Sequence, residues 1–174
     1  MKFCVLSLIF GIAGAFANEV KLVESNRSLH VIHHAADAPE TAKLAAREIQ
    51  HAIQESTGVM LVITSEKVTS PAIRIASDGR LPHDGFEIRV EAQDVIISGN
   101  DDLAPAKPDT WFVPSHGTLF GAQEFVERFI GVRWLFPGEL GEDVPKLDVL
   151  SIALKEAIRG APDRKSTRLN SSHA

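Results

Sequence analysis

The sequence has a single cysteine, Cys4, and it lies close to the start of the chain. The residues around it are interpreted below as a leader that is removed, which leaves a mature chain without cysteine. Such a chain has no disulfide, no thiolate metal site and no cysteine nucleophile. A lipoprotein cysteine would follow the apolar leader, so Cys4, which lies inside it, does not indicate a lipid anchor.

The sequence also has no excess of basic residues. The chain carries 18 lysines and arginines against 23 acidic residues, a net charge of -5. An acidic chain is poorly suited to polyanions, so nucleic acid is not an expected partner. The apolar share of 44% and charged share of 24% exclude disordered, collagen-like and multi-span membrane chains. A length of 174 residues fits about one domain.

No apolar run is long enough for a stable membrane anchor. Residues from Phe3 to Phe16 are apolar or small and follow the basic start at Lys2, but a membrane span needs roughly 20 residues. Ala15-Phe16-Ala17 fits an A-x-A cleavage site. We therefore expect residues 1–17 to be a cleaved signal peptide and the mature protein to be secreted or periplasmic.

The other end of the sequence, residues 164–174, is polar and has no periodicity. It resembles translated sequencing-adapter sequence, the alternative being a genuine polar tail. We expect residues 18–160 to form the domain and residues 161–174 to combine the start of a linker with a non-native or disordered tail.

Apolar periodicity predicts helices at 38–57 and 117–130, and strands at 20–23, 29–33, 59–63, 72–76, 85–90, 94–99, 132–136 and 147–154. Asp37, Pro39 and Glu40 predict a capped helix start, and Gly58 predicts its end. The short link at 91–93 predicts an antiparallel hairpin. Together these elements predict an α/β fold: a mixed β-sheet sandwich with two main helices packed on the sheet.

Two expectations about burial follow from this pattern. The continuous apolar run 59–63 predicts a buried strand. The second helix and the strand after it carry six large apolar residues, most of which we expect in the core: Phe120, Phe125, Phe129, Val132, Trp134 and Phe136.

Candidate chemistry is sparse. His30 and His34 would share one face of a strand, but no third metal ligand is identifiable, so no metal or other cofactor is expected. Glu139 and Glu142 lie in one loop and could serve glycoside hydrolysis, which needs paired carboxylates. Nothing in the sequence around them raises one pKa above the other. We therefore assign no catalytic residue.

The Ser115-His116 pair precedes the second helix, where structural capping is the favoured interpretation. A G-x-S-x-G elbow is absent. Trp111 and Phe112 lie in the proline-rich segment 100–115 and are candidates for a ligand or docking surface, together with His116. Exposed aromatic rings of this kind could stack on sugars or pack on a neighbouring domain.

The segment from Gly117 to Pro145 resembles a stretch that ends the N-terminal domain of certain secreted bacterial glycosidases, with the pattern G-T-x-Y-G-x-x-x-F-L-E-x-x-x-G-V-R-W-x-x-P-G. Those proteins include α-glucuronidase-like enzymes, and the accessory domain of β-N-acetylhexosaminidases is similar. Segments 84–88 and 96–99 also match weaker patterns of that family. Phe120 and Val126 depart mildly from it, where tyrosine and leucine are usual.

The resemblance implies an α/β accessory domain that docks against a catalytic (β/α)8 barrel, with the catalytic carboxylates in the barrel. It implies a chain truncated before that barrel, whose start would lie near 161–163. The expected partners are therefore the missing barrel of the same protein and, less directly, a polysaccharide or oligosaccharide.

Two alternatives remain open from the residues alone. One is a stand-alone carbohydrate-binding module that uses Trp111 and its neighbours. The other is a small hydrolase that uses Glu139, Glu142 or the histidines. A row of exposed aromatic rings would favour the first, and convergent carboxylates with perturbed pKa values would favour the second.

Overall fold

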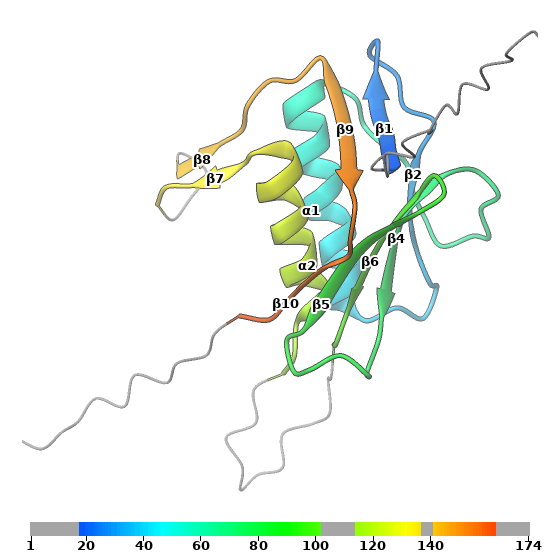
Figure 1. The fold of residues 1–174 in the computed structure, drawn as a ribbon, viewed down its shortest axis with the longest axis vertical. Coiled ribbons are helices and arrows are strands. Elements are labelled where there is room, and N and C mark those ends of the chain that lie inside the picture. Colours follow the sequence, from blue (N-terminus) through cyan, green and yellow to red (C-terminus); the bar gives the residue numbers. More distant parts are fainter. Residues whose placement is uncertain (1–17, 102–113, 137–140, 163–174) are drawn as a thin grey trace, which may run out of the picture.

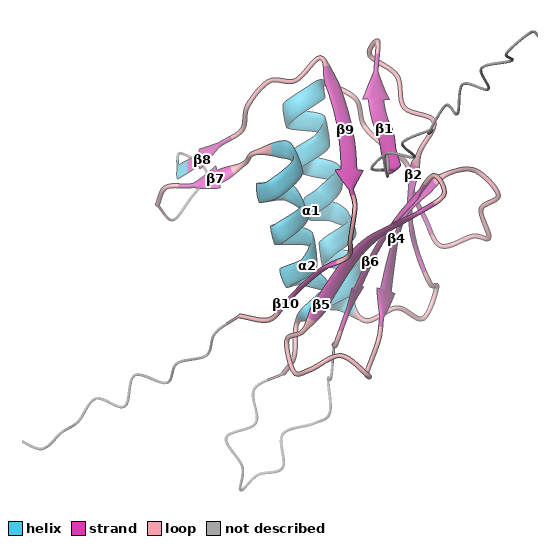
Figure 2. Cartoon of the chain, viewed as in Figure 1, coloured by secondary structure: helices cyan, strands magenta, loops and turns pink. Residues whose placement is uncertain are grey.

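The computed structural model describes residues 18–101, 114–136 and 141–162. They form two layers, with the helices in one layer and the strands in the other (Figures 1 and 2). This is the expected α/β arrangement of a mixed sheet with two main helices packed on it.

The elements follow one another in an order close to the predicted one. Their bounds are β1 Asn18–Glu24, β2 Val31–His34, α1 Glu40–Thr57, β3 Ile63–Thr64, β4 Ala72–Ser77, β5 Phe86–Glu91, β6 Asp94–Gly99, α2 Gly117–Phe125, η1 Val126–Ile130, β7 Arg133–Trp134, β8 Glu142–Asp143, β9 Val149–Leu154 and β10 Ile158–Gly160. The predicted hairpin is confirmed, because β5 and β6 pair in antiparallel fashion. Strands β8 and β10 were not predicted.

The main sheet has six strands in the order β10-β5-β6-β4-β2-β3. The strands β3, β2, β4 and β6 run parallel, whereas β5 and β10 are antiparallel to their neighbours. Because side chains alternate along a strand, one face of this sheet is apolar and the other polar. Ile73, Ile88 and Ile97 lie on the apolar face, which the helices cover.

A second, two-stranded sheet joins the two ends of the described chain. β1 pairs with β9 in antiparallel register, with Val20 opposite Ile152. Both side chains are fully buried and belong to the same hydrophobic core as the helices. Segments more than 100 residues apart in sequence are therefore held together.

Helix α1 buries the face that its periodicity predicts. Ala45, Ile49 and Ile53 have no exposed surface. Gly58 ends the helix with a φ of 75°, a left-handed conformation that glycine adopts without strain. The predicted capping box is wrong, because the helix starts at Glu40 after Pro39 and no side chain caps it.

The second helix is α-helical from Gly117 to Phe125 and continues as a π-helical turn, η1. The wider turn lets the Gly131 amide donate to the carbonyl of Val126 at 3.0 Å. Gly131 then ends the helix with a φ of 88°, as predicted.

The expectation of a buried strand at 59–63 is wrong. Only Ile63 and Thr64 pair with β2, and Met60 and Val62 are 65% and 64% exposed. Leu61 is the buried residue between them. Buried and exposed residues alternate along the run, which lies at the edge of the sheet, and no other described segment covers its outer face.

The predicted strand 132–136 is short, and its predicted burial is wrong for two of its aromatic residues. Val132 and Phe125 are buried, but Trp134 and Phe136 are 48% and 54% exposed. The reason is that Arg133 and Trp134 pair with β8 in a ribbon of their own and do not join the main sheet.

Among the described residues, no helix has the length and apolar character that crossing a membrane requires.

Candidate functional site

Of the three residues predicted for a ligand or docking surface, only His116 is described. Trp111 and Phe112 lie outside the described residues. His116 is the residue before α2, and its backbone amide donates to Asp84 Oδ1 at 2.9 Å. Its ring Nδ1 is buried and has no hydrogen-bond partner among the described residues. A ligand-binding role for His116 stays a prediction.

His116 lies beside a largely buried cluster that we call the polar junction: Asp84, Asn100, Asp101, Ser115 and Thr118. The Asp84 amide donates to Ser115 Oγ at 2.7 Å, and Ser115 Oγ donates to the Asn100 carbonyl at 2.6 Å. Ser115 has no exposed surface. Its hydroxyl is therefore engaged in structure and is not presented as a nucleophile.

The polar junction joins three segments at very close range. The Gly117 amide donates to the Asn100 carbonyl, and the Asn100 amide donates to the Gly85 carbonyl, at 2.8 and 2.9 Å. A Cβ placed on Gly117 would lie 2.3 Å from the Gly85 oxygen. Only glycine fits there, so the start of α2 contacts the ends of two strands directly.

Asp101 caps α2 from within the junction. Its carboxylate accepts from the Thr118 amide at 3.0 Å and from the Thr118 hydroxyl at 2.8 Å. Burial raises the pKa of Asp101 above its usual value, although the Thr118 hydrogen bonds oppose the shift. Asp101 comes directly before residues 102–113 in the sequence and Ser115 comes shortly after them, so the junction fixes the chain on both sides of the segment that carries Trp111.

We expect Asp101→Ala to lower the free energy of unfolding by about 1–3 kcal/mol, because it leaves the buried amide and hydroxyl of Thr118 without an acceptor. Asp101→Asn keeps one acceptor oxygen and should cost less. Urea unfolding of the two variants and the parent chain gives the comparison. Equal losses in both variants would contradict the capping role.

Comparing the parent chain with Asp101→Asn also tests the raised pKa of Asp101. An acid whose pKa is raised in the folded state binds its proton more tightly there, so its contribution to stability grows as the pH falls through the folded pKa. The parent chain should therefore gain stability relative to Asp101→Asn between pH 7 and pH 4. A constant difference across this range would contradict the raised pKa.

The histidines do not converge. His30 is buried, and its Nε2 lies 3.1 Å from the Gln93 carbonyl oxygen. His34 Nδ1 lies 2.8 Å from the carbonyl oxygen of Ala35. Within the described ranges, no three histidine, cysteine or acidic side chains are grouped closely enough to hold a metal ion.

The loop that carries Glu139 and Glu142 shows no pair of facing carboxylates among the described residues. Glu139 lies outside the described residues. Glu142 and Asp143 are successive residues of β8, so their side chains point to opposite sides of the strand.

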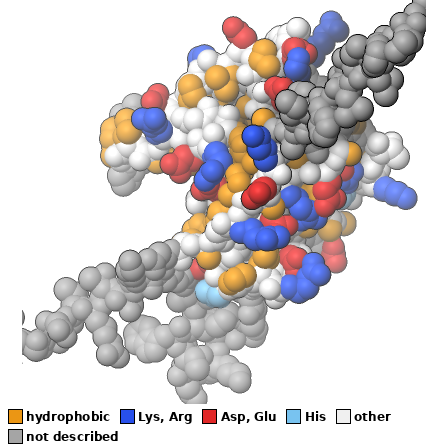
Figure 3. Space-filling view, viewed as in Figure 1, with side chains coloured by type: hydrophobic (Ala, Val, Ile, Leu, Met, Phe, Trp, Pro, Cys, Tyr) orange, Lys and Arg blue, Asp and Glu red, His pale blue; other side chains and the backbone are white. Residues whose placement is uncertain are grey.

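The polar face of the main sheet carries ion pairs. Arg89 Nε binds Glu91 Oε1 at 2.7 Å and its Nη1 binds Glu87 Oε1 at 3.1 Å. Arg74 Nε binds Asp94 Oδ2 at 2.6 Å. Burial acts to raise the pKa of Asp94, but hydrogen bonds from Arg74 and the Ala72 amide lower it overall. Figure 3 shows basic and acidic side chains close to one another in the region where Figure 1 has β4, β5 and β6.

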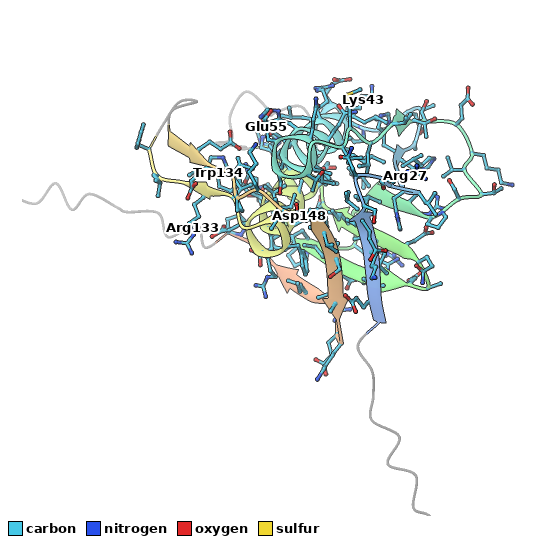
Figure 4. All side chains as sticks on the ribbon, turned by 90° about the horizontal axis from the view of Figure 1, so that it is seen from above. Arg27, Lys43, Glu55, Arg133, Trp134 and Asp148 are labelled. Atoms are coloured by element: carbon cyan, nitrogen blue, oxygen red, sulfur yellow. The ribbon has the colours of Figure 1, made fainter. Side chains whose placement is uncertain are left out.

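Trp134 and the two residues after it present apolar surface, although Trp134 and Phe136 were predicted to lie in the core. Trp134, Leu135 and Phe136 are 48%, 68% and 54% exposed. The ribbon projects from the helix layer in Figure 1, and Figure 4 shows Trp134 at the opposite end of the view from Arg27. The adjacent exposed side chains form a local apolar patch.

No protein-family model matches the chain, and no curated protein matches it either. Some solved structures are similar to it. A family GH115 4-O-methyl-α-glucuronidase with specificity for decorated arabinogalactans is similar over 76% of this chain, with a TM-score of 0.52 and 15% identity. A GH138 enzyme that targets pectin rhamnogalacturonan II is similar over 57%, with a TM-score of 0.40 and 15% identity. The chain spans 18% of the first enzyme and 10% of the second. Its α/β fold is thus one that occurs as a part of a much larger glycoside hydrolase.

Proposed function

We propose that this chain is a non-catalytic N-terminal domain of a secreted carbohydrate-active protein, and that it packs against a (β/α)8 glycoside hydrolase barrel. The observation that carries the proposal is the likeness to a GH115 glucuronidase of which the chain spans only 18%. Because the chain corresponds to less than a fifth of that enzyme's length, the remainder of a protein of similar length can contain a separate catalytic barrel.

The described carboxylates support a non-catalytic role. A glycosidase needs two acids that flank one sugar bond, one of them with a raised pKa. Asp94 has a lowered pKa, and its carboxylate is bound by Arg74. Asp101 has a raised pKa, but it is only 7% exposed and both of its oxygens bind Thr118. Neither acid is arranged to protonate a substrate.

The apolar patch of the β7–β8 ribbon supports docking to the barrel. Trp134, Leu135 and Phe136 are successive residues that are 48%, 68% and 54% exposed. They follow the helix layer, and the ribbon that begins with Trp134 projects away from the main sheet in Figure 1. Covering them would remove apolar surface from water, the main favourable contribution to packing between domains. The sheet face, with its ion pairs, is the side suited to stay in solvent.

The proposal is tested by turnover. The purified chain should release no product from aryl glycosides, glucuronylated xylan fragments or decorated arabinogalactan. The longer protein, obtained by extending the reading frame, should hydrolyse at least one glycan. Turnover by the purified chain that Glu142→Gln or Glu139→Gln abolishes would show that the chain is itself an enzyme.

A further inference from the structure

A hollow of about 430 Å³ opens at the carboxyl ends of β2 and β4. Its walls come from the loop between β2 and α1, including Asp37 and Pro39, and from the end of β4, including Ile75 and Ser77. It is distinct from the polar junction and from the β7–β8 ribbon, which contribute no residue to it.

The topology of the sheet explains why a hollow forms there. β2 and β4 are parallel neighbours. From β2 the chain passes through α1 to β3, on one side, whereas from β4 it passes to β5 and β6, on the other side. The two connections leave the sheet in opposite directions and open a crevice between them. In open α/β sheets, crevices at such reversals are where ligands bind.

The lining combines a small apolar surface with a few polar groups, as ligand sites do. Ala38 and Pro39 contribute to the apolar part, and Asp37, Ser77 and Arg74 to the polar part. The charge of Arg74 is offset by its bond to Asp94 at 2.6 Å. The guanidinium is thereby held in place at the edge of the hollow without creating a strong positive field.

The imidazole of His33 adds a group that can both donate and accept a hydrogen bond. It pairs in register with Arg74 on β4, so the two side chains share one face of the sheet. Burial, with Arg74 and His34, lowers the pKa of His33, so its ring is neutral at pH 7. A neutral imidazole offers one N–H donor and one acceptor nitrogen. Donors and acceptors are thus mixed in a hollow of little net charge.

We propose that this hollow binds one neutral pyranose unit of a glycan. Asp37 and Ser77 would bind ring hydroxyls, Arg74 and His33 would position the sugar, and Pro39 would contact an apolar face of the ring. The choice of a sugar among neutral polyhydroxylated molecules rests on the proposed function. The site is a binding site and carries no reaction.

A longer glycan has a path out of the hollow. A neighbouring hollow of about 710 Å³ shares Ala76 and Ser77 with the first and continues over Ser98 to Arg89 and Glu87. These residues lie on the polar face of the main sheet, where Glu87 of β5 is opposite Ser98 of β6. Paired carboxylates and guanidinium groups suit sugar hydroxyls, which donate to one and accept from the other. We therefore expect oligosaccharides to bind more tightly than monosaccharides.

The test is an NMR titration of the full chain with xylose, methyl β-galactoside, xylotriose and glucuronic acid. At least one neutral sugar should shift the amide signals of residues 33–39 and 74–77, with a Kd on the order of 1 mM. The double variant Asp37→Ala/Ser77→Ala should raise that Kd at least tenfold. Both residues are exposed, and thermal unfolding should confirm that the variant folds as the parent does.

Asp148→Ala is the matched control. Asp148 lies with Glu55 near the carboxyl end of α1, whereas the hollow lies at its amino end, and the 18-residue helix is roughly 27 Å long. Figure 4 labels both residues. This substitution also removes an exposed carboxylate, and it should leave the Kd unchanged.

Three results would overturn the inference: no shift with any neutral sugar, shifts with glucuronic acid alone, or an unchanged Kd in the double variant. None of these bears on the proposed function. Release of sugar product in the same samples would contradict the proposed function while leaving the binding site in place.

Discussion

Replacing Phe125 with alanine is expected to lower the free energy of unfolding by about 3–5 kcal/mol. Phe125 is fully buried at the end of α2, and its ring centroid lies 5.5 Å from that of Phe129. Truncation would remove the ring and leave a cavity between the helix layer and the sheet. Since whole domains are stable by only about 5–15 kcal/mol, the variant should unfold at markedly lower urea concentrations.

Trp134→Ala provides the comparison. Trp134 is 48% exposed and lies on the β7–β8 ribbon, outside the main sheet. In the isolated chain the substitution should cost less than about 1 kcal/mol, in the range of surface substitutions. In a longer protein with a barrel it should cost more. If the isolated variants lose equal stability, the ribbon belongs to the core and is not free for docking.

Gly99→Ala is expected to destabilise the chain by about 3 kcal/mol or more. A Cβ at this position would lie 2.0 Å from the backbone nitrogen of Thr118 and 2.2 Å from the carbonyl carbon of Gly117. These are backbone atoms of α2, so no side-chain rotation can relieve the contact. The helix would have to move away from β6 and break the polar junction.

Gly79→Ala is the control for this substitution. A Cβ there would meet nothing within 4 Å. The change should leave stability equal or slightly higher, because alanine restricts the unfolded chain. Urea unfolding of both variants measures the difference. A Gly99→Ala protein as stable as Gly79→Ala would mean that α2 is not held tightly against β6.

The fold was predictable where a periodic pattern has one buried face. Ile49 and Ile53 mark the buried side of α1, and Phe86 and Ile88 mark that of β5, as their spacing indicates. The prediction failed for Trp134, because an apolar residue in a strand does not reveal which sheet the strand joins. Pairing with β8 depends on residues beyond the strand itself.

The candidate sites were harder to predict from the sequence than the fold was. Ser115-His116 pointed to the start of α2, but nothing local indicates that Asp84, 31 residues earlier, binds Ser115. The hollow beside His33 and Arg74 depends on the order of strands in the sheet. Asp84-Gly85 and Ser98-Gly99 were quoted as family patterns, and the close approach at Gly99 supplies a physical reason for glycine at that position.

The pairing of β1 with β9 has a consequence for synthesis of the protein. Val20, Leu22 and Val23 of β1 are buried in the finished fold, yet the strand that pairs with them ends at Leu154. A ribosome adds about 5–20 residues per second, so β1 waits on the order of ten seconds for its partner. During that time the nascent chain has an unpaired apolar strand near its front. The core can therefore close only after Leu154 has left the ribosome, and until then the apolar first strand is available to a translocation channel or a chaperone.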